Sequence, residues 1–567
     1  MPLDLVNGNW VVRKIGVIGP GIVGMPMAAL LADAAIREGS DTPARVVVLQ
    51  RASATSGWKV EAINQGRSPI GGVEPDLDRI VERASRAGLL SATHDVADLK
   101  DADVILVCVQ TDKKGIEPDY GPLFEALDGL ARVLKDRPAG NVPLIIFEST
   151  LAPSSMATVI GAHFARHGLV DGRDLLLGNS PNRVMPGRLV ERVAQSDKVV
   201  AGLSPVTAEL IRRLYARIVT KGTLHPTNSL TAEVVKTLEN AYRDVRIAFS
   251  SEVARWCDQH DIDFYRLRQE VNQRIDQSDE ASRDPNAVPS GGLLIPTVGV
   301  GGHCLPKDGI LLWWRLLESG QDTSRSLILE ARRINDESPA ATMALAERKF
   351  GSLAGKRVAL LGTAYRFNSE DTRNSPTLPL ARLLNERGAK VTLHDPYVYE
   401  RDQNLARASL TDQFTRDLGV ALEGAEVIIF CTGHRVYLEE RDRILGTPTL
   451  RGLVDACNLL QPGQLNGKAE IATGIGRGRN PPSPALVGEI EACFRAVETG
   501  VANEVGGVVG YLNDHYASDE FNRVQFSEVQ RIAGTCVTGC SIADQGPVVE
   551  RAGEGFRSRL VDRARGR

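Results

Sequence analysis

Short apolar runs alternate along the chain with longer segments of helical periodicity. The first run, 13–18, ends in the turn Gly19-Pro20-Gly21-Ile22-Val23-Gly24, and the apolar helical segment 25–31 follows it. Further apolar runs lie at 44–49, 103–109, 143–147 and 174–178. Buried runs separated by helix-length segments are typical of parallel strands joined by crossover helices. We therefore predict an α/β fold that begins with a doubly wound, Rossmann-like domain.

A long helical pattern from Thr231 to about His260 precedes a second series of strand-like runs. This series comprises 355–362, 390–396, 425–430 and 452–456. We predict two Rossmann-like doubly wound domains joined by a long central helix, with a C-terminal extension. The expected domains are 11–215, 216–340 with the central helices, 341–479 with the second α/β unit, and 480–567 as linker and accessory tail. A polar loop is expected at 277–292 and an amphipathic tail helix at 486–497.

The glycine turn after the first run has the GxGxxG spacing of a dinucleotide site. Gly19 makes the turn, Gly21 admits a pyrophosphate, and Gly24 lets the helix pack closely on the strand. The phosphates would rest on the helix N-terminus. Ile22 and Val23, inside the turn, are therefore also expected to bind the dinucleotide.

The second strand ends in Gln50-Arg51, where an acidic residue usually holds the ribose 2′-hydroxyl of NAD. Gln50 can still hydrogen-bond to a hydroxyl, whereas Arg51 could meet the 2′-phosphate of NADP or point to solvent. On chemistry alone, the choice between NAD and NADP stays open.

Polar clusters follow three successive predicted strands. They are Gln110-Thr111-Asp112, Glu148-Ser149-Thr150 and Asn179-Ser180-Pro181-Asn182-Arg183. Ligands bind at the carboxyl ends of parallel strands in such sheets, so we expect a site here. Thr111, Thr150, Asn182 and Arg183 are its candidate residues.

A single thiol, Cys304, lies in the glycine-rich stretch 299–308, with Lys307 and Asp308 close behind it. A buried helix is expected from Gly309. A helix N-terminus and an ammonium both lower a thiol pKa, and the glycines free backbone N–H groups for an oxyanion. On this stretch alone, a catalytic nucleophile and a buried structural cysteine remain alternatives.

Charged and amide residues share one face of the long helix: Glu233, Lys236, Asn240 and Arg243 follow helical spacing. The stripe is either a solvated face or a set of groups that face the thiol. In the second α/β unit, the stretch 363–376 after the first strand lacks GxGxxG but carries Arg366 and Arg373, which suit an anionic ligand.

Composition narrows the classes of function. The net charge is −4, from 67 basic and 71 acidic residues, without a long basic run, so nucleic acid is not expected as a partner. We expect neither a secretory signal nor a membrane span, since apolar runs stay short of ~20 residues. The eight cysteines are scattered, which is typical of a cytoplasmic protein. Cys536 and Cys540 lack partner ligands nearby, and no metal site is predicted.

Over about 11–478 the chain resembles the UDP-glucose/GDP-mannose dehydrogenase family. The resemblance rests on motifs in the family's order: GPGIVG at 19–24, EST at 148–150, SPNRVMPG at 180–187, AEVVKTLENAYRDV at 232–245, GVGGHCLPKD at 299–308, ARRIND at 331–336 and LGTAYRFNSEDTRNSP at 361–376. It implies an NAD-dependent, four-electron oxidation of a nucleotide-sugar C6 hydroxyl to a carboxylate. It also implies a cytoplasmic homodimer or larger homo-oligomer, and makes 341–479 the nucleotide-sugar-binding domain.

By this resemblance, Cys304 attacks an aldehyde intermediate, and oxidation of the adduct gives a thioester that water hydrolyses. Lys236 and Asn240 would stabilise oxyanions, and Asp308 would orient or activate water. Thr150 joins the catalytic set, and Thr111, Thr150 and Lys307 join the cofactor set. The implied substrate-binding residues are Asn182, Arg183, Lys236, Asn240, Arg243, Gly301, Arg366 and Arg373.

The chain departs from the family pattern at Asn182, where a glutamate usually serves thioester hydrolysis. Either another carboxylate (Asp308, Glu148 or Glu233) takes that role, or hydrolysis is slow. The GGHC sequence favours UDP-N-acetylglucosamine or UDP-N-acetylmannosamine as substrate, with UDP-glucose as the alternative. An enzyme that stops at the aldehyde or thioester, and a non-catalytic nucleotide-sugar binding protein, are further alternatives. The resemblance favours NAD over NADP.

Overall fold

The computed structural model describes residues 10–71, 74–138, 142–184, 186–275, 292–465, 467–536, 540–548 and 555–566. The loop predicted at 277–292 lies outside these residues, except for Gly292. The chain forms two compact units. The first comprises Met1–Glu239, Leu311–Gln321 and Gly506–Ser541, and the second Asn240–Ile310, Asp322–Val505 and Ile542–Arg567. The four expected domain bounds stay a prediction.

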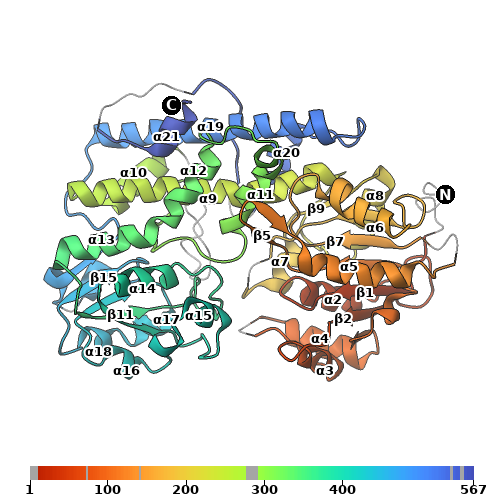
Figure 1. The fold of residues 1–567 in the computed structure, drawn as a ribbon, viewed down its shortest axis with the longest axis horizontal. Helices are drawn as coiled ribbons and strands as arrows, with labels where there is room; N and C mark the ends of the chain where they lie inside the picture. Colours follow the sequence, from red (N-terminus) through yellow and green to blue (C-terminus); the bar gives the residue numbers. More distant parts are fainter. Residues whose placement is uncertain are drawn as a thin grey trace. The chain divides into compact units, whose positions relative to one another are not determined.

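An eight-stranded sheet forms the centre of the first unit (Figure 1). Its strands are β1 (Lys14–Ile18), β2 (Arg45–Leu49), β3 (Leu90–Thr93), β4 (Val104–Val107), β7 (Leu144–Phe147), β8 (Leu176–Asn179), β9 (Lys198–Gly202) and β10 (Leu224–Asn228). The order is β10-β9-β8-β7-β4-β1-β2-β3, and the β8–β9 pair is antiparallel. Strand order reverses between β1 and β4, which is where doubly wound sheets bind ligands. A hairpin of β5 (Asp112–Lys114) and β6 (Glu117–Asp119) stands apart.

Alternate residues of these strands enter two separate cores, one on each face of the sheet. In β4, Val104 and Leu106 join one core, and Ile105 and Val107 join the other. The first core is covered by α2 (Gly24–Asp33), α4 (Leu77–Arg86), α7 (Leu189–Gln195) and α8 (Pro205–Tyr215). The second is covered by α5 (Gly121–Leu134), the π-helical turn η3 (Met156–Gly161) and α6 (Ala162–Arg166). Apolar residues that face both ways explain why these strands read as continuous apolar runs.

A six-stranded parallel sheet forms the centre of the second unit. Its strands are β11 (Arg357–Leu361), β12 (Lys390–His394), β13 (Phe414–Thr415), β14 (Val427–Phe430), β15 (Gly452–Asp455) and β16 (Ala472–Gly474). The order β13-β12-β11-β14-β15-β16 repeats the order around β1. Its helices are α14 (Thr377–Glu386), α15 (Gln403–Ala408), α16 (Leu418–Leu422), α17 (Arg435–Glu439) and α18 (Arg441–Leu445). The prediction of two Rossmann-like sheets is confirmed.

The long helix α9 (Ser229–His260) supplies residues to both units, as the apolar pattern predicts. The other central helices are α10 (Phe264–Arg274), α11 (Leu305–Glu318), α12 (Leu327–Asp336) and α13 (Ser338–Phe350). None of the helices in the described residues combines the length and apolarity that crossing a membrane requires.

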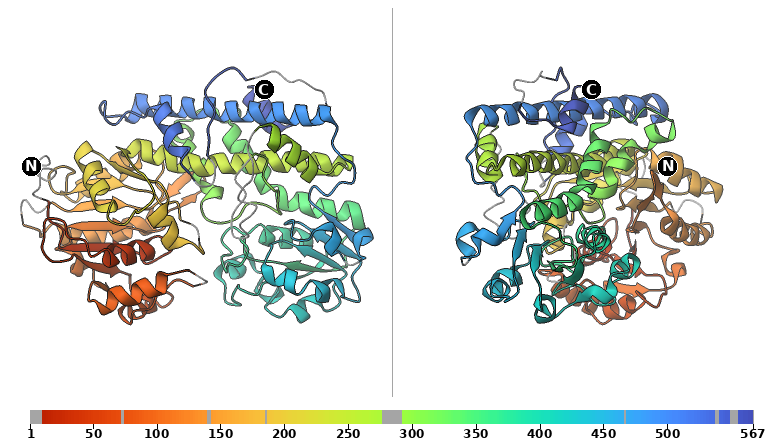
Figure 2. Two further views of the ribbon diagram at one scale, coloured as in Figure 1. Left: turned by 180° about the vertical axis from the view of Figure 1, so that it is seen from behind. Right: turned by 60° about the vertical axis from the view of Figure 1, so that its left-hand side comes forward.

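The tail forms α19 (Pro484–Tyr516), α20 (Phe526–Ala533) and α21 (Arg559–Ala564). The helix predicted at 486–497 is part of α19, which has 33 residues. In the second unit α19 lies alongside α9 (Figure 2). The two helices are antiparallel, because Tyr242 contacts Glu498 and the rings of Phe249 and Phe494 lie 6.2 Å apart. Tertiary packing thus extends a helix whose sequence contains four glycines after Val497.

Candidate active site

The turn between β1 and α2 has the geometry of a phosphate-binding loop. Gly19 has a φ of +94°, and a Cβ at Gly24 would lie 2.1 Å from the Gly19 carbonyl oxygen, so both positions require glycine. A Cβ at Gly21 would meet no described atom within 4 Å, which leaves open space over the turn. Helix α2 begins at Gly24, directly after Ile22 and Val23, so the N-terminal end of its dipole lies at this turn. These residues fit a dinucleotide pyrophosphate.

A lysine that the sequence analysis missed lies beside this turn. The Lys59 ammonium is 3.4 Å from the carbonyl oxygen of Pro20, and burial lowers the pKa of Lys59. Its signal is weak, because a lysine on a short helix (α3, Trp58–Asn64) is an ordinary surface feature. A cation at this place adds to the attraction for phosphates.

Gln50 and Arg51 are both engaged within the chain. The Gln50 amide donates to the Ser56 hydroxyl at 3.0 Å and to the Arg51 carbonyl at 3.1 Å. Arg51 is exposed and pairs with the exposed Glu125 at 3.3 Å. An exposed arginine that already has an acidic partner does not form a dedicated 2′-phosphate site.

The predicted polar edge of the first sheet brings two pairs of residues together. The buried Thr111 hydroxyl donates to the Thr150 carbonyl at 2.6 Å, which joins the ends of β4 and β7. Asn182, which follows β8, donates its amide to the Glu148 carboxylate, and both side chains are buried. The sequence analysis expected both clusters to lie at this edge, but not these contacts.

Glu148 belongs to a buried polar network. It accepts hydrogen bonds from Lys198 at 2.9 Å, from Tyr215 and from Asn182. Burial raises the pKa of Glu148, against the opposing effects of Lys198, Tyr215 and Asn182. Burial also lowers the pKa of Lys198. The carboxylate and the ammonium are each harder to charge than in water, so this pair can exchange a proton more easily than a surface pair.

Arg183, the neighbour of Asn182, is committed to protein partners. It forms a buried ion pair with Glu239 and donates to the Thr535 hydroxyl at 2.9 Å and the Ile532 carbonyl at 3.0 Å. These contacts join the motif to the tail segment after α20. A direct role of Arg183 toward a substrate stays a prediction.

In the second unit, Cys304 immediately precedes α11, which begins at Leu305, four residues earlier than predicted. The Cys304 carbonyl accepts the N–H groups of Lys307 at 3.1 Å and Asp308 at 2.9 Å, as a helix N-cap residue does. The thiol is half-buried. Cys304 therefore lies at a helix N-terminus, and Lys307 and Asp308 lie within the first turn.

The glycines before Cys304 pack against the arginine-bearing stretch 363–376. The Gly302 N–H donates to the Arg373 carbonyl at 2.8 Å, and the Asn374 amide donates to the Gly302 carbonyl at 2.9 Å. A Cβ at Gly301 would lie 2.4 Å from the Tyr365 Cβ, so Gly301 permits this close contact. Burial, aided by Asp371, raises the pKa of Tyr365 to about 12, which keeps this phenol neutral beside the thiol turn.

The two predicted arginines have different surroundings. Arg373 pairs with Asp371, with Nε 2.9 Å from a carboxylate oxygen. The Arg366 guanidinium lies 5.4 Å from the centre of the Phe367 ring. Both remain candidates for an anionic ligand.

Asp308, Asn240 and Lys307 form a buried group in the second unit. The Asn240 amide donates to Asp308 at 2.6 Å, and the Lys307 ammonium donates to the other Asp308 oxygen at 2.8 Å. Lys307 and Asp308 are both almost fully buried. The acid and the amide that the resemblance brings together are thus in contact.

Lys236 and Cys304 belong to different units, so their proximity stays a prediction. Lys236 lies one helical turn before Asn240 on α9, and Lys236, Asn240 and Arg243 are each half-buried. Glu233 is buried and accepts the backbone N–H groups of Ser154 and Met156, each at 2.7 Å. Burial raises the pKa of Glu233 to about 8. Glu233 is therefore not part of a solvated stripe, and the orientation of Lys236, Asn240 and Arg243 toward the thiol stays a prediction.

The comparisons with known proteins agree with this arrangement. Three domain profiles of the UDP-glucose/GDP-mannose dehydrogenase family match the chain: the NAD binding domain over residues 13–219, the central domain over 230–337 and the UDP binding domain over 359–462. The chain is 31% identical over 471 residues to UDP-N-acetyl-D-mannosamine dehydrogenase of Pyrococcus horikoshii, a match that covers 82% of this chain and 99% of that one. It is 28% identical over 448 residues to NDP-N-acetyl-D-galactosaminuronic acid dehydrogenase of Ralstonia solanacearum, covering 76% and 93%.

Solved structures give the same picture. The NDP-N-acetyl-D-galactosaminuronic acid dehydrogenase of Methanosarcina mazei superposes with a TM-score of 0.69 at 30% identity, covering 84% of this chain and 98% of that one. The UDP-D-ManNAc dehydrogenase of Pyrococcus horikoshii gives a TM-score of 0.66 at 30% identity, covering 82% and 100%.

Proposed function

Since the chain belongs to the UDP-glucose/GDP-mannose dehydrogenase family and is an NAD-dependent nucleotide-sugar dehydrogenase, we propose that it oxidises the C6 hydroxyl of a UDP-N-acetylhexosamine to the uronic acid. The observation that carries the proposal is Cys304 at the N-terminus of α11, with Asp308 of the same helix bound to Asn240. A thiol, an acid and an amide are the groups that a covalent oxidation of an aldehyde requires.

The reaction removes four electrons in two steps, each as a hydride that NAD takes up when it is bound. The turn at Gly19–Gly24 and Lys59 would hold its pyrophosphate. In the first oxidation the C6 alcohol loses a hydride and a proton and becomes an aldehyde. The Cys304 sulfur then bonds to C6, which gives a thiohemiacetal. Loss of the second hydride gives a thioester, and water cleaves the C–S bond to release the carboxylate and the thiol.

Lys236 and Asn240, one helical turn apart on α9, would stabilise the negative oxygen at C6 in each tetrahedral intermediate. Lys307 and Asn240 fix the position of the Asp308 carboxylate in the helix that follows the thiol. In this position Asp308 accepts one N–H of the Asn240 amide and so fixes its rotamer. The second N–H would then be free to donate to the substrate oxygen.

We propose that Glu148 takes the base role that the family assigns to the residue at position 182. Glu148 is the carboxylate in contact with Asn182, and burial raises its pKa toward the range in which a base works. The other two candidates are less suited. Glu233 binds the backbone N–H groups of Ser154 and Met156, and Asp308 binds Lys307 and Asn240. Within the described residues, neither is hydrogen-bonded to Asn182 as Glu148 is.

We propose UDP-N-acetylmannosamine as the first substrate to test, because several similar curated proteins bear its name. UDP-N-acetylglucosamine follows from the GGHC sequence, and UDP-N-acetylgalactosamine from the second group of relatives. UDP-glucose remains the alternative outside the N-acetylhexosamines. The proposal extends to a cytoplasmic homo-oligomer, as the resemblance implies.

The test is the number of NADH molecules formed per sugar consumed, measured with each of these four UDP-sugars. Two NADH per sugar with an N-acetylhexosamine supports the proposal, and the C304A variant should then form no acid. One NADH per sugar, or a burst that stops at one or two per active site, would identify an enzyme that stalls at the aldehyde or thioester. Two NADH with UDP-glucose alone would overturn the substrate assignment, and full acid formation by C304A would overturn the covalent route.

A further inference from the structure

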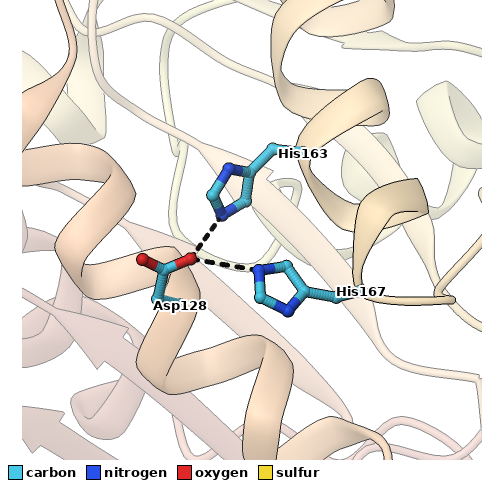
Figure 3. Close-up of side chains that lie close together, drawn as sticks. All are labelled: Asp128, His163 and His167. Carbon is cyan, nitrogen blue, oxygen red and sulfur yellow. Dashed lines mark hydrogen bonds and ion pairs between the residues drawn. The ribbon is translucent and has the colours of Figure 1, made fainter.

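A cluster of one carboxylate and two imidazoles lies on the face of the first sheet covered by α5 and α6 (Figure 3). Asp128 comes from α5, His163 from α6, and His167 ends α6 as its C-cap residue. The potential ligand atoms of the three side chains lie within 4.8 Å of one another. None of the three residues is among the candidates for the cofactor or the sugar. We propose that Asp128, His163 and His167 bind a divalent transition metal ion of the zinc class.

The distances match a shared ion. The Nε2 atoms of His163 and His167 each lie 3.0 Å from the same oxygen, Asp128 Oδ1. Zinc binds imidazole nitrogen and carboxylate oxygen at about 2.0–2.2 Å, which separates neighbouring ligand atoms by about 3 Å. Two imidazoles and a carboxylate are also a donor set that zinc accepts, and a water molecule would complete the coordination.

His163 supplies an independent argument. Its side chain is more than nine-tenths buried, and among the described residues its Nε2 has no partner with hydrogen-bond geometry, although it points at Asp128. A buried nitrogen without a hydrogen bond is unfavourable, and a bound ion would satisfy it.

The surrounding residues hold these ligands in place. The His163 ring stacks on Phe124 with centroids 4.8 Å apart, and the edge of Phe164 lies against it. His163 and His167 are four residues apart, so helical geometry directs them to the same side. This His-x3-His spacing is the signal that the sequence analysis missed, because it searched for metal sites among the cysteines. An ion here would join α5 to the end of α6 and stabilise the first unit.

The test is metal uptake by the full chain, purified without a histidine tag and stripped with EDTA. Calorimetric titration with Zn²⁺ at neutral pH should give one ion per chain, and Zn²⁺ should raise the Tm. H167A and D128N should each weaken binding by at least about 100-fold, the upper end of what outer-shell ligand partners contribute. H515A removes an exposed histidine of α19 and is the matched control that should bind as the native chain does.

Two further readouts separate this site from a thiol or a folding defect. The Co²⁺ form should absorb in the visible range without a sulfur-to-cobalt charge-transfer band, because none of the three ligands is a thiol. In EDTA, H167A and D128N should have native circular dichroism. Absence of uptake, unchanged binding in both variants, or a sulfur-to-cobalt band would each overturn the proposal.

Discussion

Each of the two sheets has a buried carboxylate near the carboxyl ends of its parallel strands. The pKa values of these two groups are shifted in opposite directions. Glu148 follows β7 in the first sheet, and Asp395 follows β12 in the second. Burial alone raises the pKa of both. For Glu148 burial prevails, so its pKa is raised. For Asp395, His434 and the backbone N–H groups of Ala364 and Tyr397 outweigh burial, so its pKa is lowered.

The two carboxylates also accept different sets of hydrogen bonds. Asp395 accepts backbone N–H groups from Thr363 and Ala364 at 2.8 and 2.9 Å, and His434 donates to it at 2.9 Å. The Asn368 N–H donates to Nδ1 of His434, which places the ring hydrogen on Nε2, toward Asp395. Among the described residues, the donors to Glu148 are all side chains. For Asp395 these donors, His434 foremost, outweigh burial, whereas for Glu148 burial outweighs Lys198, Tyr215 and Asn182.

The same contrast applies to the turns after β1 and β11. In the second sheet, Asp395 accepts the backbone N–H groups of the turn after β11. In the first sheet, the space over Gly21 in the equivalent turn after β1 is open. The acidic residue that the sequence lacks after β2 is thus present after β12, where it binds the protein's own backbone. Because the Asp395 carboxylate already binds these N–H groups, the turn after β11 does not offer them to the pyrophosphate of a second dinucleotide.

The largest expected effect comes from E148Q, which tests the assignment of the base. We expect a burst of two NADH per active site, followed by turnover slowed by about 10²–10⁴-fold, because the thioester forms but is not hydrolysed. Stopped-flow absorbance at the NADH band measures both phases. The double variant E148Q/N182E should recover turnover, since it places a new carboxylate at residue 182, which contacts residue 148. Steady turnover of E148Q at the native rate would contradict the contrast between the two carboxylates.

The next effect is on folding, and it concerns Asp395. D395N keeps the shape of the side chain but replaces a charged acceptor of several N–H groups, and we expect a loss of about 3 kcal/mol in stability. Urea unfolding followed by circular dichroism measures it. The kcat of the remaining folded enzyme should be unchanged, which distinguishes Asp395 from Glu148. A fall in kcat without a change in the unfolding midpoint would show that the structural role is wrong.

The apolar runs predicted both sheets, because strands that are buried on both faces leave a strong local signal. Weaker strands were missed: β3 (Leu90–Thr93) is half polar, and β13 has two residues. The early start of α11 was missed although Pro306 suits a first helical turn. The full length of α19 was missed because the glycines of the tail have low helix propensity. Tertiary packing stabilises the helix despite them.

The site could be predicted as a set of motifs but not as contacts. Each motif is local, whereas Asn182 meets Glu148 across 34 residues and His434 meets Asp395 across 39. The family resemblance therefore left Glu148, Glu233 and Asp308 as possible bases without separating them. The contact that separates Glu148 from the other two, with Asn182, exists only in the folded chain.

The stability that Asp395 contributes should depend on pH, because proton binding is linked to folding. The folded pKa of Asp395 is lowered, so its stabilising effect is fully present above the unfolded value of about 3.9 and is lost as the pH falls through the folded value. The difference in Tm between the native chain and D395N should therefore be constant from pH 7 to about 5 and shrink below pH 4. Calorimetric scans across this range measure it. A difference that grew on acidification would mean that the pKa of Asp395 is raised.

The smallest effect concerns the tuning of Glu148 by Tyr215. The Tyr215 hydroxyl donates to Glu148 and opposes the rise in its pKa, so Y215F should raise that pKa further. One hydrogen bond to a charged group corresponds to about 1 pH unit. Because Glu148 must be ionised to act as a base, the acidic limb of the kcat profile should move to higher pH by about that amount. The matched control is Y437F in α17 of the second unit, whose hydroxyl hydrogen-bonds with His394. Tyr437 does not donate to Glu148, so Y437F should leave the acidic limb of the kcat profile in place. If Y437F moves that limb as far as Y215F does, the shift reflects a general loosening of the fold and not a change in the pKa of Glu148.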